Sequence, residues 1–250
     1  MSTDIRPAAQ TAATSSAIRQ LVDPRHGPLP LLLLALTAVT GLVDAVSILQ
    51  LGRVFVANMT GNVVFTGFAI GGAPGFSLSA SLYALAGFLV GATVGGMLIA
   101  QLARDRALLL GGGVAAEFLL IVTACAVATE AGTPFSSAAR DIIAALLALA
   151  MGIQNAVARR LAVPDMTTTV LTMTLTGIAA DVRSRSYGPA LLRRLSAVAT
   201  MLGGGVLGAW LVVHTSAAAT LSVAAGVMAI VTAGTALAAR RPATWRQSQP

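Results

Sequence analysis

Two polar stretches interrupt an otherwise apolar sequence, and they hold most of the side chains that could do chemistry. The first, residues 41–67, reads GLVDAVSILQLGRVFVANMTGNVVFTG, and the second, residues 152–177, reads GIQNAVARRLAVPDMTTTVLTMTLTG. Polar groups are costly in hydrocarbon unless they are paired, face a cavity or serve a function. These stretches therefore mark the candidate site.

In the first stretch, Asn58, Thr60, Gly61 and Asn62 have the types expected where a chain turns and starts a helix. Asn and Thr cap helix N-termini well, and Gly permits a sharp turn. A half-helix that starts here would present free N–H groups at mid-depth of a membrane. Such an N-terminus attracts anions and carboxylates, so we predict that these four residues bind substrate.

The second stretch offers matching groups. The hydroxyls of Thr168, Thr169 and Thr172, with the amides of Gln154 and Asn155, would form the other edge of the site. The alternative is that these side chains only hydrogen-bond helices together. We favour binding, because two matched polar stretches are harder to explain as packing than one.

Two acidic residues lie within apolar segments. Asp44 and Glu117 could accept a proton or hold a cation that drives transport. The alternative is that each is neutral or paired and stabilises a helix contact. Asp44 aligns with the uncharged Asn155, so a coupling role at this position would belong to one half only.

The two polar stretches are related in sequence, which indicates a duplicated membrane unit. The equivalent pairs are Gly41 with Gly152, Asp44 with Asn155 and, after a slip of one residue, Thr60 with Thr172. Duplication would place the two stretches opposite each other in the middle of the protein.

Composition identifies the class of protein. Of 250 residues, 56% are hydrophobic and only 10% are charged, against roughly 25% charged in soluble domains. Apolar runs of about 20 residues, long enough to span a bilayer, recur along the chain. We predict an all-α polytopic membrane protein, in which the net charge of +7 orients the chain and does not bind nucleic acid.

Eight apolar segments fall into two sets of four, at 29–51, 54–72, 78–102, 107–129, 141–161, 166–182, 189–213 and 216–239. We therefore divide the chain into a disordered cytoplasmic tail, two membrane repeats and a second cytoplasmic tail, at residues 1–28, 29–130, 139–240 and 241–250.

Arginine placement decides how the two shortest segments, 54–72 and 166–182, cross. If both are re-entrant and the N-terminus is cytoplasmic, 14 of the 16 basic residues lie inside, and only Arg53 and Arg140 lie outside. Eight crossings would give 11 inside and 5 outside. The positive-inside rule favours six spans plus two re-entrant or broken segments, with inverted halves; the alternative is eight spans with parallel halves.

Glycine recurs every four residues in both halves, at Gly87, Gly91 and Gly95 and again at Gly204 and Gly208. Small stripes let helices approach closely. We predict packing inside the chain, because both halves have a stripe.

Several motifs are absent from the sequence, including a phosphate-binding loop, HExxH, paired metal-binding cysteines and GxSxG. We expect no enzyme, no cofactor and no metal site. The expected partners are the lipid bilayer and an unknown small solute, and formation of a homo-oligomer stays open.

Short signatures mark each half. They are Gly41-x-x-Asp44-Ala45, Phe55 and Met59-Thr60-Gly61-Asn62, then Gly152-x-Gln154-Asn155-Ala156 and Thr168-Thr169-Val170-Leu171-Thr172. Together, over residues 30–240, they resemble the YoaK-like family of uncharacterised bacterial inner-membrane proteins. Met173 departs from the pattern, since Gly is expected there, and implies a straighter helix. The resemblance implies a multi-pass membrane protein and supplies no substrate.

These features favour a small secondary transporter or channel for a small solute, with an anion or carboxylate suggested by the helix N-termini. Both termini would be cytoplasmic and the membrane would be the inner membrane. The alternative is a non-transporting scaffold, sensor or lipid-binding protein, whose polar stretches hold helices together.

Overall fold

The computed structural model describes residues 26–164, 166–184, 189–240 and 243–247, and these residues form an all-α fold. The elements are α2 (Leu29–Gln50), α3 (Met59–Ile70), α4 (Leu78–Leu102), α5 (Arg106–Ala131), α6 (Ser137–Leu161), α7 (Thr172–Ser184), α8 (Pro189–His214), α9 (Ala217–Ala239) and the 3₁₀ turn η1 (Thr244–Arg246).

Six of these helices are long and apolar enough to cross a membrane: α2, α4, α5, α6, α8 and α9. By contrast, α3 has 12 residues and α7 has 13, fewer than the roughly 20 that a helical span needs. The prediction of an all-α polytopic membrane protein is confirmed. The proposed tail over residues 1–28 lies almost wholly outside the described residues.

Polar side chains set where four of the long helices begin. The N-terminal caps of α4, α5, α6 and α9 accept hydrogen bonds from backbone N–H groups of the first turn, and these caps are Ser77, Asp105, Ser136 and Ser216. Such a cap satisfies N–H groups that have no partner within the helix. Short capped connections therefore turn the chain back on itself at each end of the bundle.

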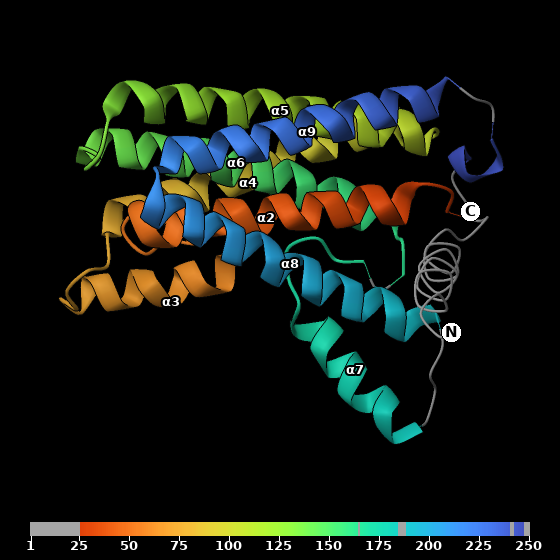
Figure 1. Cartoon of the computed structure of the whole chain (residues 1–250), viewed down its shortest axis with the longest axis horizontal. Coiled ribbons are helices and arrows are strands. Elements are labelled where there is room, and N and C mark those ends of the chain that lie inside the picture. Colours follow the sequence, from red (N-terminus) through yellow and green to blue (C-terminus); the bar gives the residue numbers. More distant parts are fainter. Residues whose placement is uncertain (1–25, 165, 185–188, 241–242, 248–250) are drawn as a thin grey trace, which may run out of the picture.

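The equivalent helices of the two halves run in opposite directions along the long axis (Figure 1). This holds for α2 and α6, for α4 and α8, and for α5 and α9. Packing follows the same pattern, since α4 lies along α6 as α8 lies along α2, and α5 contacts α9. The arrangement has approximate twofold symmetry, with α2 and α6 as the most buried helices.

The glycine stripes lie inside these helix contacts, as predicted. A Cβ atom added at Gly91 of α4 would lie 2.1 Å from the Leu149 carbonyl oxygen of α6. A Cβ atom added at Gly204 of α8 would lie 2.3 Å from the Ala38 carbonyl oxygen of α2. Both distances are far below van der Waals contact, so the helices approach this closely only because these positions have no side chain.

The two central helices contribute a glycine of their own to each contact. A Cβ atom at Gly152 would lie 2.3 Å from the Phe88 carbonyl oxygen, and one at Gly41 would lie 2.5 Å from the Met201 carbonyl oxygen. Gly41 and Gly152 are the first aligned pair of the two polar stretches. These two glycines align in the sequence because they occupy equivalent positions in the two helix contacts.

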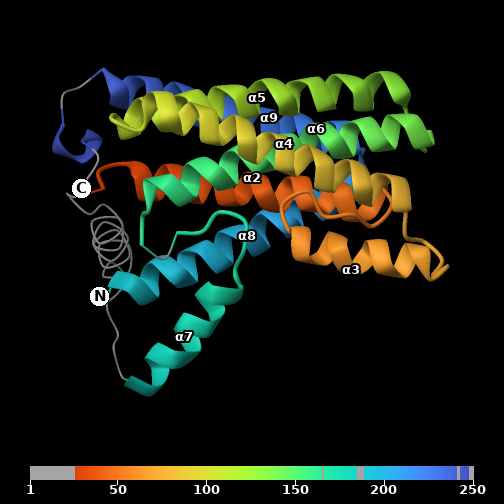
Figure 2. The ribbon, with the colours of Figure 1, turned by 180° about the vertical axis from the view of Figure 1, so that it is seen from behind.

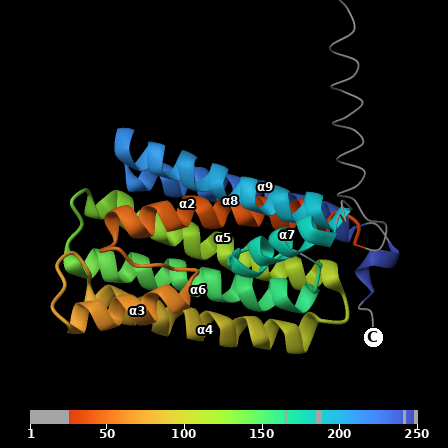
Figure 3. The ribbon, with the colours of Figure 1, turned by 90° about the horizontal axis from the view of Figure 1, so that it is seen from below.

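Both short helices are on the same side of the bundle and begin near the middle of its length (Figures 2 and 3), but α3 runs along the bundle whereas α7 slants away from it (Figure 2). Each is preceded by a non-helical segment, residues 51–58 before α3 and residues 162–171 before α7. Each helix then runs outward to the end of the bundle at which the preceding long helix stopped.

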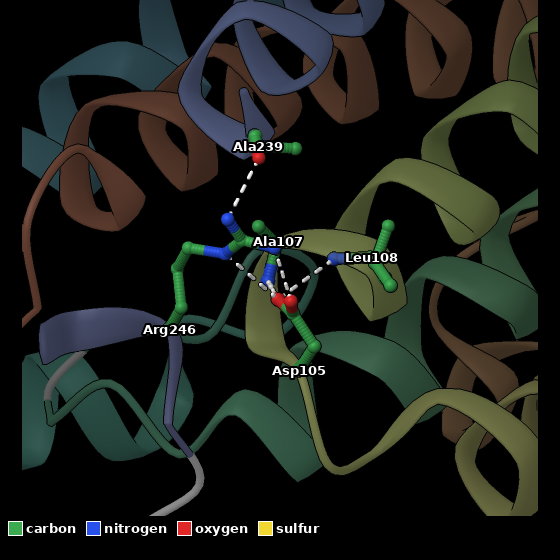
Figure 4. Close-up of polar contacts among 5 residues, drawn as sticks. All are labelled: Asp105, Ala107, Leu108, Ala239 and Arg246. Carbon is green, nitrogen blue, oxygen red and sulfur yellow. Dashed lines mark hydrogen bonds and ion pairs between the residues drawn. The ribbon is translucent and has the colours of Figure 1, made fainter. Parts of the chain in front are cut away.

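The C-terminal segment closes one end of the bundle. The Arg246 guanidinium pairs with the Asp105 carboxylate and donates a hydrogen bond of 2.7 Å to the Ala239 carbonyl oxygen (Figure 4). The Trp245 ring covers Gly27, where an added Cβ would lie 2.5 Å from the ring. The described chain ends therefore meet at the same end of the bundle.

Asp105 has two roles at this closure, because it also caps α5 through the N–H groups of Ala107 and Leu108. Partial burial raises the pKa of its carboxyl, but hydrogen bonds from Arg246 and from these two N–H groups outweigh burial and hold the pKa below its ordinary value. Asp105 is therefore ionised at neutral pH and holds the C-terminal segment in place.

The glycine contacts give a first testable prediction. Gly91→Ala should destabilise the protein by about 1–3 kcal/mol, because α4 and α6 must move apart to admit the methyl group. Thermal unfolding in detergent, followed by circular dichroism, measures the effect. Gly96→Ala is the matched control on the same helix, because nothing lies within 4 Å of an added Cβ there. Equal stability of the two variants would contradict the close contact.

Candidate functional site

Asn62 holds the segment that leads into α3. Its side chain is fully buried, its Oδ1 accepts a hydrogen bond of 2.8 Å from the Phe55 N–H, and its Nδ2 donates to the Phe55 carbonyl oxygen. Gly61 makes room for this contact, since an added Cβ would lie 2.6 Å from the Phe55 ring. The two residues fix the turn, and the Asn62 amide is already used within the protein.

Among the four predicted residues at the start of α3, Asn58 and Thr60 are the ones whose side chains are free to meet a ligand. Asn58 precedes α3, but its side chain makes no capping hydrogen bond, and the Thr60 side chain is exposed. The first-turn N–H groups of α3, which no helix can satisfy internally, therefore lack a side-chain cap. An anion would complete their hydrogen bonding.

The second stretch is tied to α6 in a corresponding way. The Thr169 hydroxyl donates a hydrogen bond of 2.9 Å to Oδ1 of Asn155. The buried Thr168 Oγ1 has no hydrogen-bond partner among the described residues, and Thr172 is the exposed first residue of α7. Met173 is 74% exposed, so its side chain leaves the start of α7 undisturbed.

Asp44 is the member of the first polar stretch that lies within α2. The backbone N–H of Val56, in the segment before α3, lies near the Asp44 carboxyl. Asp44 also lines a cavity of about 630 Å³, together with Leu171, the residue before α7. Its Oδ1 atom is buried and has no hydrogen-bond partner in the described part of the chain.

This cavity is a groove between α2 and α8. Apart from Asp44 it is almost entirely apolar, with α8 contributing Val198, Met201, Leu202, Gly205, Val206 and Ala209. Sequence reasoning did not find these α8 residues, because apolar residues that line a groove have the same pattern as apolar residues that face lipid. In the sequence, only the neighbouring glycines distinguish this part of α8, and glycines indicate close helix packing without indicating a groove.

Glu117 and Gln154 belong to a second, much smaller cavity. The Gln154 Nε2 donates a hydrogen bond of 2.9 Å to the Thr40 hydroxyl, which donates to the Leu36 carbonyl oxygen. The Oε1 atoms of Gln154 and Glu117 have no partner among the described residues, and both side chains line an enclosed space of about 10 Å³. That volume is close to the minimum for one water molecule.

The predicted site residues do not share one cavity. Asp44 lines the α2–α8 groove together with Leu171, the residue before α7. Glu117 and Gln154 line a different cavity within α2, α5 and α6. The lining of the groove includes none of Asn58, Thr60, Gly61, Asn62, Asn155, Thr168, Thr169 and Thr172. Within the described residues, no three His, Cys, Asp or Glu side chains are placed to hold a metal ion.

Comparison with known proteins identifies the family. The family described as "Protein of unknown function (DUF1275)" matches residues 32–234. The chain belongs to this family. Among its relatives, the UPF0700 transmembrane protein YoaK of Bacillus subtilis (strain 168) is 36% identical over 162 residues, which cover 62% of this chain and 67% of the relative. The YoaK-like resemblance is thereby confirmed, and the match supports the conclusion that this chain is a transmembrane protein. No solved structure matches the chain.

The two asparagines that flank the start of α3 offer a matched test of this geometry. Asn62→Ala should lower stability by about 1–3 kcal/mol or more, because it leaves the Phe55 N–H and carbonyl groups unpaired. Asn58→Ala should change stability little, since the Asn58 side chain caps no N–H group. Thermal unfolding of the two purified variants measures both effects. A larger loss for Asn58→Ala would contradict the assignment of Asn62 as the residue that fixes the turn.

Proposed function

We propose that the protein is a small secondary transporter, in which α3 and α7 are re-entrant and the solute binds beside Asp44, near the first turns of both helices. The observation that carries the proposal is the pair of short helices that start near mid-length, one in each of two oppositely directed halves. Inverted halves with interrupted helices that meet near the midplane are a recurrent transporter plan.

The first turns of α3 and α7 favour an anionic solute, because a helix N-terminus carries a partial positive charge. Asp44 would oppose an anion when ionised and accept it when protonated, since a protonated carboxyl donates a hydrogen bond. Proton uptake by Asp44 would thus favour solute binding and couple the two fluxes. Asn155, at the equivalent position, cannot titrate, so coupling would use one half only.

The proposed orientation puts both termini in the cytoplasm and the protein in the bacterial inner membrane. The arginine distribution supports it, and so does the contact between Gly27 and Trp245 near the two chain ends. The chain carries no motif of a common enzyme, so the proposal includes no catalytic activity.

A second candidate function is a non-transporting scaffold, sensor or lipid-binding protein. The observation in its favour is that the side chains of Asn62 and Thr169 form their hydrogen bonds with other groups of the protein. In this alternative the polar stretches stabilise the fold, and no step moves a solute across the membrane.

Access to position 44 from the two sides of the membrane distinguishes the functions without requiring a known solute. In a Cys125→Ala background, Asp44→Cys should react with membrane-impermeant thiol reagents added to either side of sealed vesicles, because a transporter opens its site to each side in turn. Mass spectrometry of the labelled protein measures the reaction.

Ser137→Cys, at the exposed first position of α6, is the control and should react from one side only. Reaction of position 44 from one side or from neither would contradict alternating access and favour the scaffold.

A further inference from the structure

The α2–α8 groove combines three features that together select a ligand. It is apolar over almost all of its lining, that lining includes Asp44, whose buried Oδ1 has no hydrogen-bond partner among the described residues, and Leu171 brings the residue before α7 to its edge. Its volume of about 630 Å³ lies within the range of sites for small organic molecules. An inorganic anion would leave most of this space unfilled.

From these features we infer that the groove binds an amphipathic organic monoanion, whose apolar body lies between α2 and α8 and whose acidic group lies at Asp44 and the first turn of α7. This inference rests on the proposed function and names the class of its solute. The apolar lining would take the hydrocarbon part of the ligand. The first-turn N–H groups of α7 would take its charge.

Asp44 would act as the proton-dependent contact. Its protonated Oδ1 would donate a hydrogen bond to an oxygen of the anion, with the proton taken from water on the side to which the groove is open. The ionised form would repel the anion. Binding should therefore strengthen as the pH falls through the titration of Asp44.

Among the residues that the structure describes, no other titratable group lines this groove. The described ionisable residues on or beside α2 and the helices α6, α8 and α9 that pack against it are His26, Arg53, Arg140, Asp141, Arg159, Arg160, Arg193, Arg194, His214 and Arg240, and none of them is among the lining residues. Glu117 lines the separate small cavity. Asp44 is the titratable group that the lining of the groove contains, so a pH dependence of binding there is assigned to it.

The second half provides an internal contrast. At the position equivalent to Asp44, the Oδ1 atom of Asn155 already accepts the Thr169 hydroxyl. The oxygen that stays available for a ligand is therefore on the α2 side. The approximate symmetry of the helices does not extend to this contact.

Binding of octanesulfonate tests the inference, because it has an apolar body and stays anionic at all working pH values. Isothermal titration calorimetry of the full-length protein in an uncharged detergent should show binding that is at least tenfold tighter at pH 5 than at pH 8. Asp44→Asn, which mimics the protonated acid, should bind equally at both pH values. Octyltrimethylammonium, which has the same tail and the opposite charge, should bind at least tenfold more weakly than octanesulfonate at pH 5.

Gly205→Phe fills the groove without a backbone clash, since nothing lies within 4 Å of an added Cβ there, and it should weaken octanesulfonate binding at least tenfold. Gly203→Phe on the same helix is the control, because it is equally open but does not line the groove. The inference is overturned if the cation binds more tightly, if Asp44→Asn keeps the wild-type pH dependence, or if the two phenylalanine variants bind alike.

Flux of octanesulfonate into proteoliposomes separates this inference from the proposed function. The expected binding pattern without any protein-dependent flux would retain the groove as a binding site and reject transport. Flux that depends on Asp44 but not on Gly205 would retain transport and reject the groove as the solute site.

Discussion

Direct backbone contact between helices is the constraint on which the rest of the structure depends. Without a hydrophobic difference between lipid and side chains, membrane helices associate through close packing. Here α4 meets α6 through Gly91 and Gly152, and α8 meets α2 through Gly41 and Gly204. Because the two contacts are equivalent, they set the approximate twofold symmetry and the opposite directions of the halves. They also place α8 beside Asp44, which forms the groove.

Hydrogen bonding explains how non-helical backbone exists beside these contacts. Within a bilayer, irregular backbone is tolerated only where its polar groups are satisfied by protein or water. The segment before α3 is satisfied in part by Asn62, which pairs with both backbone polar groups of Phe55. Before α7, Thr169 is tied to Asn155. Some polar residues of each stretch are therefore needed to form a half-length helix. Asp44 and the first turns of α3 and α7 are the polar groups that stay available for a ligand.

Periodicity and internal similarity predicted much of the fold, because both reflect packing that repeats in the chain. The four-residue glycine spacing identified the contact faces, and the alignment of Gly41 with Gly152 identified equivalent positions. The role of Asn62 could not be predicted, since an amide that fixes a turn and an amide that binds a solute have the same sequence signal. The apolar α8 side of the groove was likewise hidden among lipid-facing residues.

The closure of one end by Asp105, Trp245 and Arg246 was also missed. These residues are far apart in the chain, and a short basic C-terminal segment has the composition of a solvated tail. The separation of Asp44 from Glu117 depends on which face each helix turns inward, and the position of an acid in the sequence does not specify that face.

The central claim is that the halves are inverted and that each short helix returns to the side from which its segment entered. Cysteine accessibility on intact cells tests it most directly, with single cysteines placed at Gly72, after α3, and at Ala103, after α4, in the Cys125→Ala background. A membrane-impermeant thiol reagent should label position 72 and leave position 103 unlabelled. Labelling of position 103 but not of position 72 would mean eight crossings with parallel halves, and would contradict the account.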